Sequence, residues 1–344
     1  MAVRQARREH ASAQPGGAAP ALRLRGLSVS FDTRRGPVPA VRDVDLEVAQ
    51  GQLLALLGES GSGKSVTARA VMGLHDERSS VTADAIEVAG HDLLATSSDG
   101  LRRLRGATMS LVFQDALSAL NPVLTIGDQI GELFRQHEGA SRKLARARSI
   151  EMLELVGIPG ARGRVDSYPH QFSGGMRQRL LIAMAIALEP QLLIADEPTT
   201  ALDVTVQAQI LELLDRLRRD LDMGVLLITH DLGVVCEVAD TVAVMYAGRI
   251  VETSSADELF DHPAHPYTEA LLASVPTVGQ VGARLPVIPG SPPVPTALPT
   301  GCPFHPRCSW AVDECRITRP ELLPVTVGRT AACLRSQEVL HGRT

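Results

Sequence analysis

A glycine-rich stretch that ends in lysine and serine has the residue types and the spacing that bind phosphate. It reads "GESGSGKS" at residues 58–65, follows a short apolar run and opens a segment of helical periodicity. Glycines at these offsets let the backbone curl so that its N–H groups point inward. We expect Lys64 to reach the β- and γ-phosphates of a nucleotide, and the Ser65 hydroxyl to ligate Mg²⁺. The glycines that shape this loop are Gly58, Gly61 and Gly63.

Acidic and polar residues that could complete such a site follow other apolar runs. "LLIADE" (192–197) places Asp196 near the metal and Glu197 one step further out, where it can polarise an attacking water. His230 ends the run "LLIT" and is placed to contact the γ-phosphate. Gln114 ends another run, and its amide could reach both the Mg²⁺ and the water. Taken alone, the two acids could begin a solvated turn, and the histidine could be structural.

Alternating strands and helices must hold these residues in place. Short apolar runs predict buried strands, and segments of helical spacing between them predict a mainly parallel, layered α/β domain. Two earlier segments alternate apolar and polar residues, as half-buried strands do. The expected strands are 22–32, 41–49, 52–57, 109–114, 191–197 and 224–230, the expected helices are 64–74 and 204–220, and a helical insertion is expected at about 115–185.

Charge and hydropathy argue against several classes of protein. The net charge of -5 over 344 residues provides no basic field for nucleic acid. No segment approaches the roughly 18 uninterrupted apolar residues of a membrane span, and the longest apolar run is "LLIAMAIAL" at 180–188. Residues 1–20 lack the apolar core of a signal peptide and are expected to be a disordered tail. The chain is therefore expected in the cytoplasm.

Four of the five cysteines fall within residues 302–333, beside a run of prolines. In a reducing compartment such clustering favours a metal site over disulfides. The gaps of five, six and seventeen residues are wider than the C-x₂₋₄-C pairs of zinc sites, so an iron–sulfur cluster suits them better. Zinc and free thiols are the alternatives, and Cys236 is expected in the core. The four clustered residues are Cys302, Cys308, Cys315 and Cys333.

A second glycine-rich stretch, "FSGGMRQR" at 172–179, contains no lysine and opens a helix-like run. Together with the motifs above and "TALD" (200–203), it resembles the ordered motifs of an ABC transporter ATPase subunit over roughly residues 22–275. The resemblance implies an ABC-type P-loop nucleotide-binding domain of α/β class with a helical insertion subdomain, followed by a small Pro/Cys-rich C-terminal domain.

The resemblance also implies that the second glycine stretch acts on another chain. The N-terminus of its helix would cap the γ-phosphate held by the facing subunit, since such a terminus carries free N–H donors. Phe31 would stack on adenine, with a core phenylalanine as the alternative. The implied nucleotide contacts are Phe31, Gly58, Ser60, Gly61, Gly63, Lys64, Ser65, Val66 and Asp196 in one chain, and Ser173, Gly174, Gly175 and Asp203 at the interface between chains.

Longer matches narrow the resemblance to one subfamily. "FQDALSALNP", "DEPTTALDVTVQAQIL", "HPYTEALL" and "GCPFHPRC" are similar to the ATPase subunits of oligopeptide/dipeptide (and nickel) importers. Met176 resembles the first of two paired subunits, because the second usually has glutamine there. Methionine cannot make the polar contact that glutamine makes to the nucleotide. The ATP site that this loop completes is therefore expected to bind ATP more weakly or to hydrolyse it more slowly. The tail of this subfamily is associated with a [4Fe-4S] cluster, which supports iron over zinc.

The resemblance thus implies an ATP-hydrolysing subunit of a peptide importer on the cytoplasmic face of the cell membrane. Its expected partners are a sister ATPase subunit, two transmembrane permease subunits and an extracellular substrate-binding protein. A nickel or small-solute importer is one alternative. A soluble ABC ATPase of DNA repair or translation is another, disfavoured by single copies of each motif and no heptad run. The expected domains are 21–260 for the ATPase and 261–344 for the C-terminal region.

Overall fold

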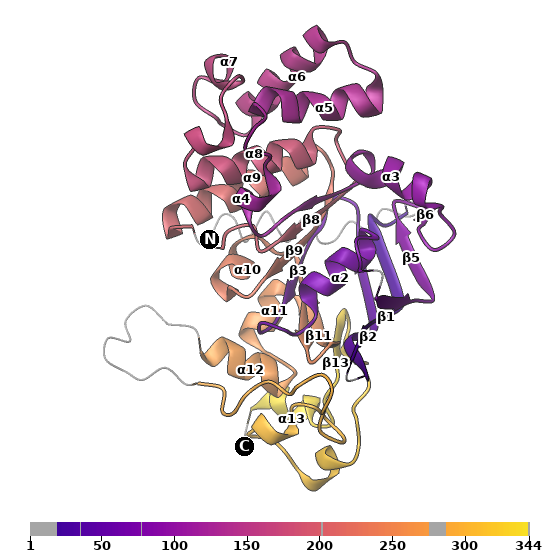
Figure 1. Cartoon of the computed structure of the whole chain (residues 1–344). Coiled ribbons are helices and arrows are strands. Elements are labelled where there is room, and N and C mark those ends of the chain that lie inside the picture. Colours follow the sequence, from indigo (N-terminus) through magenta and orange to yellow (C-terminus); the bar gives the residue numbers. More distant parts are fainter. Residues whose placement is uncertain (1–18, 35, 77, 201, 275–286, 343–344) are drawn as a thin grey trace.

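An eight-stranded sheet forms the centre of the structure, a computed structural model that describes residues 19–342 except 35, 77, 201 and 275–286 (Figure 1). The tail expected at residues 1–20 therefore lies almost entirely outside the described residues. Five neighbouring strands run parallel, in the order β7-β8-β9-β3-β10. They are β7 (Met109–Val112), β8 (Leu192–Asp196), β9 (Gly224–Thr229), β3 (Leu53–Leu57) and β10 (Thr241–Tyr246).

The parallel strands are buried on both faces, which explains their continuous apolar sequences. In β3, Leu53, Ala55 and Leu57 belong to one hydrophobic core, and Leu54 and Leu56 belong to another on the opposite face. Helices pack into the first core, and α2 packs into the second. The α/β class predicted from the sequence is confirmed. The helices are α2 (Lys64–Val71), α8 (Gly174–Ile186), α9 (Val204–Asp220) and α10 (Leu232–Val238).

A second, antiparallel sheet covers the core on the α2 side. Its long strands β1 (Leu22–Thr33) and β2 (Gly36–Val48) alternate buried and exposed side chains, as their sequences predict. The three short strands of this sheet were not expected, because four residues or fewer carry too little periodicity to recognise. They are β4 (Ser79–Thr82), β5 (Ala85–Val88) and β6 (His91–Asp92), and α3 (Ser98–Ala107) leads on to β7.

The stretch between β7 and β8 is helical and forms the upper part of Figure 1. Serine and threonine side chains begin its helices: Thr125 caps α5 and Ser141 caps α6, each accepting a hydrogen bond from a backbone N–H of the first turn. Among the described residues, no helix is long and apolar enough to cross a membrane. The elements are α4 (Ala116–Ala119), α5 (Ile126–Glu138), α6 (Arg142–Leu155), α7 (Ala161–Arg164) and the 3₁₀ turn η1 (Pro169–Gln171).

The residues after β10 continue the central sheet into the C-terminal region (261–344). β11 (Arg249–Ser255) pairs antiparallel with β10 and also with β13 (Arg329–Ala331), which in turn pairs with β12 (Leu323–Thr326). Figure 1 shows this region below the sheet in orange and yellow. Its other elements are α11 (Ala256–Asp261), α12 (Pro266–Ala273), η2 (His305–Arg307), η3 (Asp313–Arg316) and α13 (Ser336–His341).

Candidate functional site

The predicted phosphate and acid residues gather at one edge of the central sheet, the one formed by the carboxyl ends of its parallel strands. β3, β9, β8 and β7 are adjacent and parallel, so their carboxyl ends lie together. The phosphate loop leaves β3, Asp196 ends β8, His230 follows β9 and Gln114 follows β7. In open α/β sheets, ligands bind at this edge. The sheet therefore brings together residues that are more than 160 positions apart in the chain.

Lys64 is folded back over its own loop. Its Nζ donates to the carbonyl oxygens of Gly58 at 2.7 Å and Glu59 at 3.0 Å, and the residue is only 5% exposed. Burial lowers the pKa of Lys64 below its usual value, because the ammonium loses hydration, and the carboxylates of Glu197, Asp196 and Glu59 partly oppose this change. Among the described residues, Nζ donates only to these two carbonyl oxygens, so this buried ammonium is well suited to bind an anion.

The loop glycines hold conformations and contacts that other residues would disturb. Gly61 has φ +79° and Gly63 has φ +113°, both in the region that favours glycine. A Cβ at Gly58 would lie 2.3 Å from the Met245 carbonyl oxygen, and one at Gly63 would lie 2.7 Å from the Ala40 carbonyl oxygen. Gly63 also caps α2, whose first-turn N–H groups lack helical partners. The loop therefore presents backbone donors at a helix N-terminus, as phosphate binding requires.

The Ser65 hydroxyl contacts the first predicted acid. Its Oγ donates to Asp196 Oδ1 at 2.9 Å, so the two predicted Mg²⁺-site groups meet although 131 residues separate them. Burial raises the pKa of Asp196; the hydrogen bond from Ser65 opposes that rise, and the neighbouring charge of Glu197 adds to it. A hydroxyl and a carboxylate side by side supply the hard oxygen ligands that Mg²⁺ prefers.

Glu197 lies at the centre of a polar cluster. Gln114 Nε2 donates to its Oε2 at 3.0 Å, and His230 Nδ1 lies 3.1 Å from its Oε1. Glu197 has φ +48°, a left-handed conformation that is uncommon outside glycine and often marks a functional position. The structure also adds Thr200, whose Oγ1 donates to Glu197 Oε2 at 2.9 Å. Thr200 begins the "TALD" motif three residues after the glutamate, but the motif alone did not assign it a contact.

The second glycine stretch begins α8. Ser173 is the N-cap, and its hydroxyl accepts from the Met176 N–H at 3.4 Å. A Cβ at Gly175 would lie 2.5 Å from Val206, so this glycine allows α8 to approach α9 closely. α8 packs against α4, α5, α6, α9 and β7, whereas α2 packs against β1, β2 and β8. The stretch is thus on a different side of the fold from the phosphate loop of its own chain.

The remaining predicted contacts are spread around the site. Phe31 is half-buried on β1, where it pairs with Val38 of β2. Ser60 is exposed in the loop, and Val66 is half-buried in the first turn of α2. Asp203 caps α9 through a 3.0 Å hydrogen bond from the Val206 N–H. Its motif "TALD" includes position 201, which lies outside the described residues.

The four clustered cysteines share one neighbourhood but form no metal-binding group. Burial raises the pKa of Cys308 to about 11 and that of Cys333 to about 12, and the other clustered thiols add to both rises. In the described part of the chain, however, no group of three or more His, Cys, Asp or Glu side chains could hold a metal ion. The thiols as they lie here therefore do not form an assembled iron–sulfur or zinc site.

Cys236 corrects another expectation. The residue is exposed, not part of the core. It lies on α10, whose buried side chains are Leu232, Val234, Val235 and Val238, so the cysteine falls on the outward face. The apolar residues around it in the sequence suggested burial, but a seven-residue helix buries only one face.

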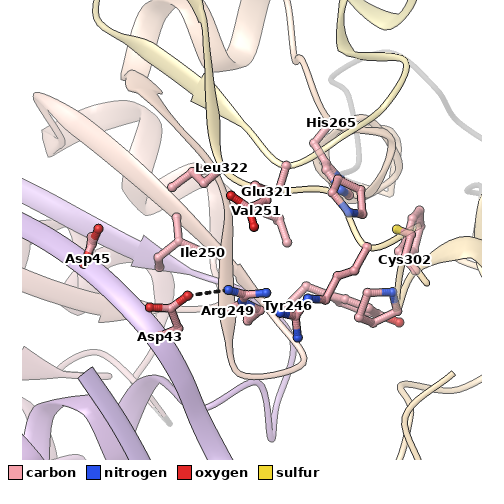
Figure 2. Close-up of a pocket in the computed structure, with 15 residues that line it drawn as sticks. Asp43, Asp45, Tyr246, Arg249, Ile250, Val251, His265, Cys302, Glu321 and Leu322 are labelled. Carbon is pink, nitrogen blue, oxygen red and sulfur yellow. Dashed lines mark hydrogen bonds and ion pairs between the residues drawn. The ribbon is translucent and has the colours of Figure 1, made fainter. Parts of the chain in front are cut away.

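A pocket of about 190 Å³ lies away from the phosphate loop and the Glu197 cluster, between β2, β11 and the C-terminal region (Figure 2). Figure 2 shows Arg249 paired with Asp43 on one wall, at 2.6 Å, and His265 and Cys302 on another. No residue of the 58–65 loop lines this pocket. The predicted phosphate and acid residues are therefore located at the carboxyl ends of the parallel strands and not here, although Cys302 of the cysteine cluster lines this pocket.

Comparison with known proteins agrees with this geometry. Residues 41–200 match the family model described as ABC transporter, and residues 251–315 match that described as oligopeptide/dipeptide transporter, C-terminal region. A protein of Brucella abortus (strain 2308) named as a peptide import ATP-binding protein is 52% identical over 315 residues, which cover 92% of this chain and 95% of the relative. A similarly named protein of Brucella melitensis biotype 1 is 49% identical and covers 93% and 98%.

Solved structures share the fold. An ATP-binding cassette solved as a dimer in a post-hydrolysis state with ADP and phosphate matches with a TM-score of 0.61 and 25% identity, covering 68% of this chain and 98% of that one. A cassette of Clostridium perfringens that is part of an ABC transporter complex also has a TM-score of 0.61, covering 70% and 91%. These findings confirm the resemblance seen in the motifs. The chain belongs to the ABC transporter family of ATP-binding proteins.

Proposed function

We propose that the chain hydrolyses ATP to drive the import of di- and oligopeptides through a membrane complex. The names of its relatives and the match of residues 251–315 to the oligopeptide/dipeptide transporter region support this cargo class. The single observation that carries the ATPase assignment is the hydrogen-bonded Glu197 cluster beside the Ser65–Asp196 pair. Both lie at one sheet edge with the glycine loop.

Each residue of the site has a distinct task in this proposal. Lys64 and the loop N–H groups would hold the β- and γ-phosphates, and Ser65 and Asp196 would hold Mg²⁺. Mg²⁺ neutralises phosphate charge when it is bound. Glu197 polarises the attacking water and accepts its proton. His230 contacts the γ-phosphate.

Gln114 completes the hydrolytic cluster. Its amide donates to Glu197 in this structure, so the same side chain can orient the carboxylate and reach the Mg²⁺ and the water. Phe31 stacks on the adenine from β1, supported by the half-buried position of its ring. Ser60 and Val66 contribute backbone contacts around the phosphates.

The second glycine stretch completes the site of another subunit. Ser173, Gly174 and Gly175 begin α8 and offer N–H donors to the γ-phosphate bound by the facing chain. Asp203 lies at the interface between the two chains. The packing of α8 away from the phosphate loop of its own chain supports action in trans. The partner is a sister ATPase subunit, because Met176 resembles one member of a pair.

The other proposed partners place the chain on the cytoplasmic face of the cell membrane. Two transmembrane permease subunits carry the channel, and their coupling helices dock on the helical stretch at 115–185. An extracellular binding protein delivers the cargo. The division into an ATPase domain (21–260) and a C-terminal region (261–344) is part of this proposal.

Reconstitution tests the proposed function. The chain, its sister ATPase, both permeases and the binding protein are placed in vesicles, and ATP hydrolysis is measured with the binding protein loaded in turn with peptide, nickel or a small glycan. We expect stimulation by peptide. Stimulation by nickel or glycan alone would transfer the cargo assignment to the alternative importers. Glu212→Gln, which changes an exposed glutamate on α9, is reconstituted in parallel as the control for preparing a variant chain.

A [4Fe-4S] cluster in the C-terminal region remains a separate proposal. It is supported by four cysteines that form no disulfide and lie within range of one another's charge. Binding would require the thiols to move closer together and lose their protons. Protein purified without oxygen is expected to be brown with about four irons per chain. Stoichiometric zinc without iron, or no metal at all, would exclude the cluster.

A further inference from the structure

An ion pair between a buried arginine and a half-buried glutamate joins the phosphate loop to the C-terminal region. Both terminal nitrogens of Arg307 donate to the carboxylate of Glu59, the second residue of the loop, at 2.7 and 3.0 Å. Arg307 is only 7% exposed, although it lies 248 positions further along the chain. A bidentate arginine–carboxylate contact fixes both the distance and the relative orientation of its two partners.

Arg307 is itself held in one orientation. Its Nε donates to the Pro289 carbonyl oxygen at 2.9 Å, and its guanidinium lies 5.9 Å from the ring centres of both Tyr246 and Phe304. Those rings pack against each other with centres 5.3 Å apart. Because the guanidinium is fixed by a carbonyl and two rings, it acts as a rigid support for the glutamate.

Every polar group of Glu59 is engaged. Its carboxylate binds Arg307, its N–H donates to the Tyr267 hydroxyl at 2.9 Å, and its carbonyl oxygen accepts from Lys64 at 3.0 Å. Tyr267 is fully buried on α12, another element of the C-terminal region. One loop residue thus connects two side chains of the C-terminal region to the phosphate-binding lysine.

The same region also covers the outer side of the loop. Residues 59–62 face Pro292, Pro293 and Leu298 across a gap of only about 20 Å³. Ser60 and Gly61 themselves stay exposed, so the proline segment lies along one side of the loop and leaves the other side open. The ion pair and the proline segment therefore act on the same part of the loop.

We propose that Arg307 is a positioning residue for the phosphate loop and that the C-terminal region sets the affinity for ATP through the Arg307–Glu59 pair. The inference rests on the proposed function, since it assumes that ATP binds at Lys64. Arg307 keeps the loop in its binding shape and neutralises a carboxylate that lies close enough to act on Lys64. Without Arg307, the unpaired Glu59 carboxylate repels the phosphates of ATP and competes with them for Lys64.

Equilibrium binding of MgATP to the full chain tests the proposal. Arg307→Met is compared with Arg316→Met, which removes an exposed arginine of the same region that pairs only with Asp313 in the described residues. We expect Arg307→Met to weaken binding about tenfold or more, which is the effect of about 1.4 kcal/mol. Arg316→Met is expected to bind as the wild type does. Once assembled with its partners, Arg307→Met is expected to raise the KM for ATP and leave kcat within about twofold.

A double variant separates positioning from general stability. Glu59→Gln in the Arg307→Met background removes the unpaired carboxylate, so affinity is expected to recover most of the loss. A purely structural role of Arg307 would predict no recovery. Equal binding by Arg307→Met and Arg316→Met, or a double variant no better than Arg307→Met, would overturn the proposal.

Two further measurements cover the remaining outcomes. If Arg307→Met does not fold, Tyr267→Phe is measured instead, because it keeps the buried ring and removes only the acceptor of the Glu59 N–H. Weaker binding at an unchanged melting temperature supports the proposal, and unchanged binding contradicts it. Lys64→Ala is run beside them. If the wild type itself binds no ATP, or Lys64→Ala binds it normally, the proposed function fails rather than this inference.

Discussion

The imidazole Nδ1 of His230 lies 3.1 Å from Oε1 of Glu197, across the ends of two neighbouring parallel strands. The carboxylate has a low exposure of 16%, whereas the imidazole is 59% exposed. The glutamate is thus fixed in the sheet edge, and the histidine covers it from the solvent side. In the proposed function, this arrangement separates Glu197, which would take the proton from water, from His230, which would contact the γ-phosphate.

Glu197→Gln is expected to keep ATP binding and lose turnover. The amide retains the size of the side chain and its contacts but cannot accept a proton from water, so kcat falls at least about 100-fold. Affinity for MgATP should stay within about threefold of the wild type. Steady-state hydrolysis and equilibrium binding measure the two effects, with Glu212→Gln on α9 as the control. Near-normal hydrolysis by Glu197→Gln would remove it as the catalytic base.

Lys64→Ala is expected to lose nucleotide binding. The chain contains one other lysine, Lys143, which is exposed on α6 and supplies a matched control. Because Lys64 is the buried cation of the loop, its loss should weaken MgATP binding at least about 100-fold. Lys143→Ala should bind as the wild type does. Comparable losses of MgATP affinity in Lys64→Ala and Lys143→Ala would mean that the nucleotide does not bind at Lys64.

Ser173→Arg is expected to act on the partner and not on its own chain. The bulky cation fills the space in front of α8, so hydrolysis in the assembled complex should stop at the facing site, while the isolated chain keeps its ATP affinity. Ser141→Arg is the control, because Ser141 caps α6 in the same way. Loss of the Ser141 cap should lower the free energy of unfolding by about 1 kcal/mol without affecting ATP turnover. Loss of ATP binding by isolated Ser173→Arg would mean that the serine serves its own site.

His265 makes stability depend on pH. The side chain is buried and accepts a hydrogen bond from the Tyr267 N–H, and burial lowers its pKa from 6.5 to about 4. Between these values the unfolded chain binds a proton that the folded chain refuses, so stability falls as pH decreases through this window. The loss from His265 between pH 7 and pH 5 should be about 2 kcal/mol.

His265→Asn isolates this effect. Asparagine can still cap α12, but it does not titrate. Burial raises the pKa of Glu252, which has the opposite pH dependence, but that residue is present in both proteins and its effect cancels in the comparison. Thermal melts at the two pH values should therefore show a smaller decrease for His265→Asn. Equal decreases in both proteins would rule out His265 as the source.

Much of the site could be predicted because its chemistry lies in contiguous motifs. The loop with Lys64 and the strand ending in Asp196 each combine a local apolar pattern with the reactive residue, so periodicity placed both at the same sheet edge. Arg307 could not be found this way. It lies between prolines and cysteines, and only the folded chain brings it to Glu59, 248 positions away.

The cysteines show how little spacing alone determines. Their clustering along the chain suggested a metal site, but spacing alone fixes neither the distance between sulfur atoms nor their protonation. The structure places them near one another with raised pKa values for Cys308 and Cys333. Cys236 was misjudged for a similar reason, since a short apolar sequence does not specify which face of its helix is buried.

The pairing of β13 with β11 has a consequence for how the chain is made. Thr253 pairs with Thr330, so the outer side of β11 stays open until residue 330 has been synthesised. Open strand edges invite pairing with other chains. A stop codon or proteolytic cut before residue 329 would leave β11 bare even though every ATP-binding motif was intact. β12 and β13 thus protect the side of β11 against pairing with other chains, and they are synthesised after every ATP-binding motif.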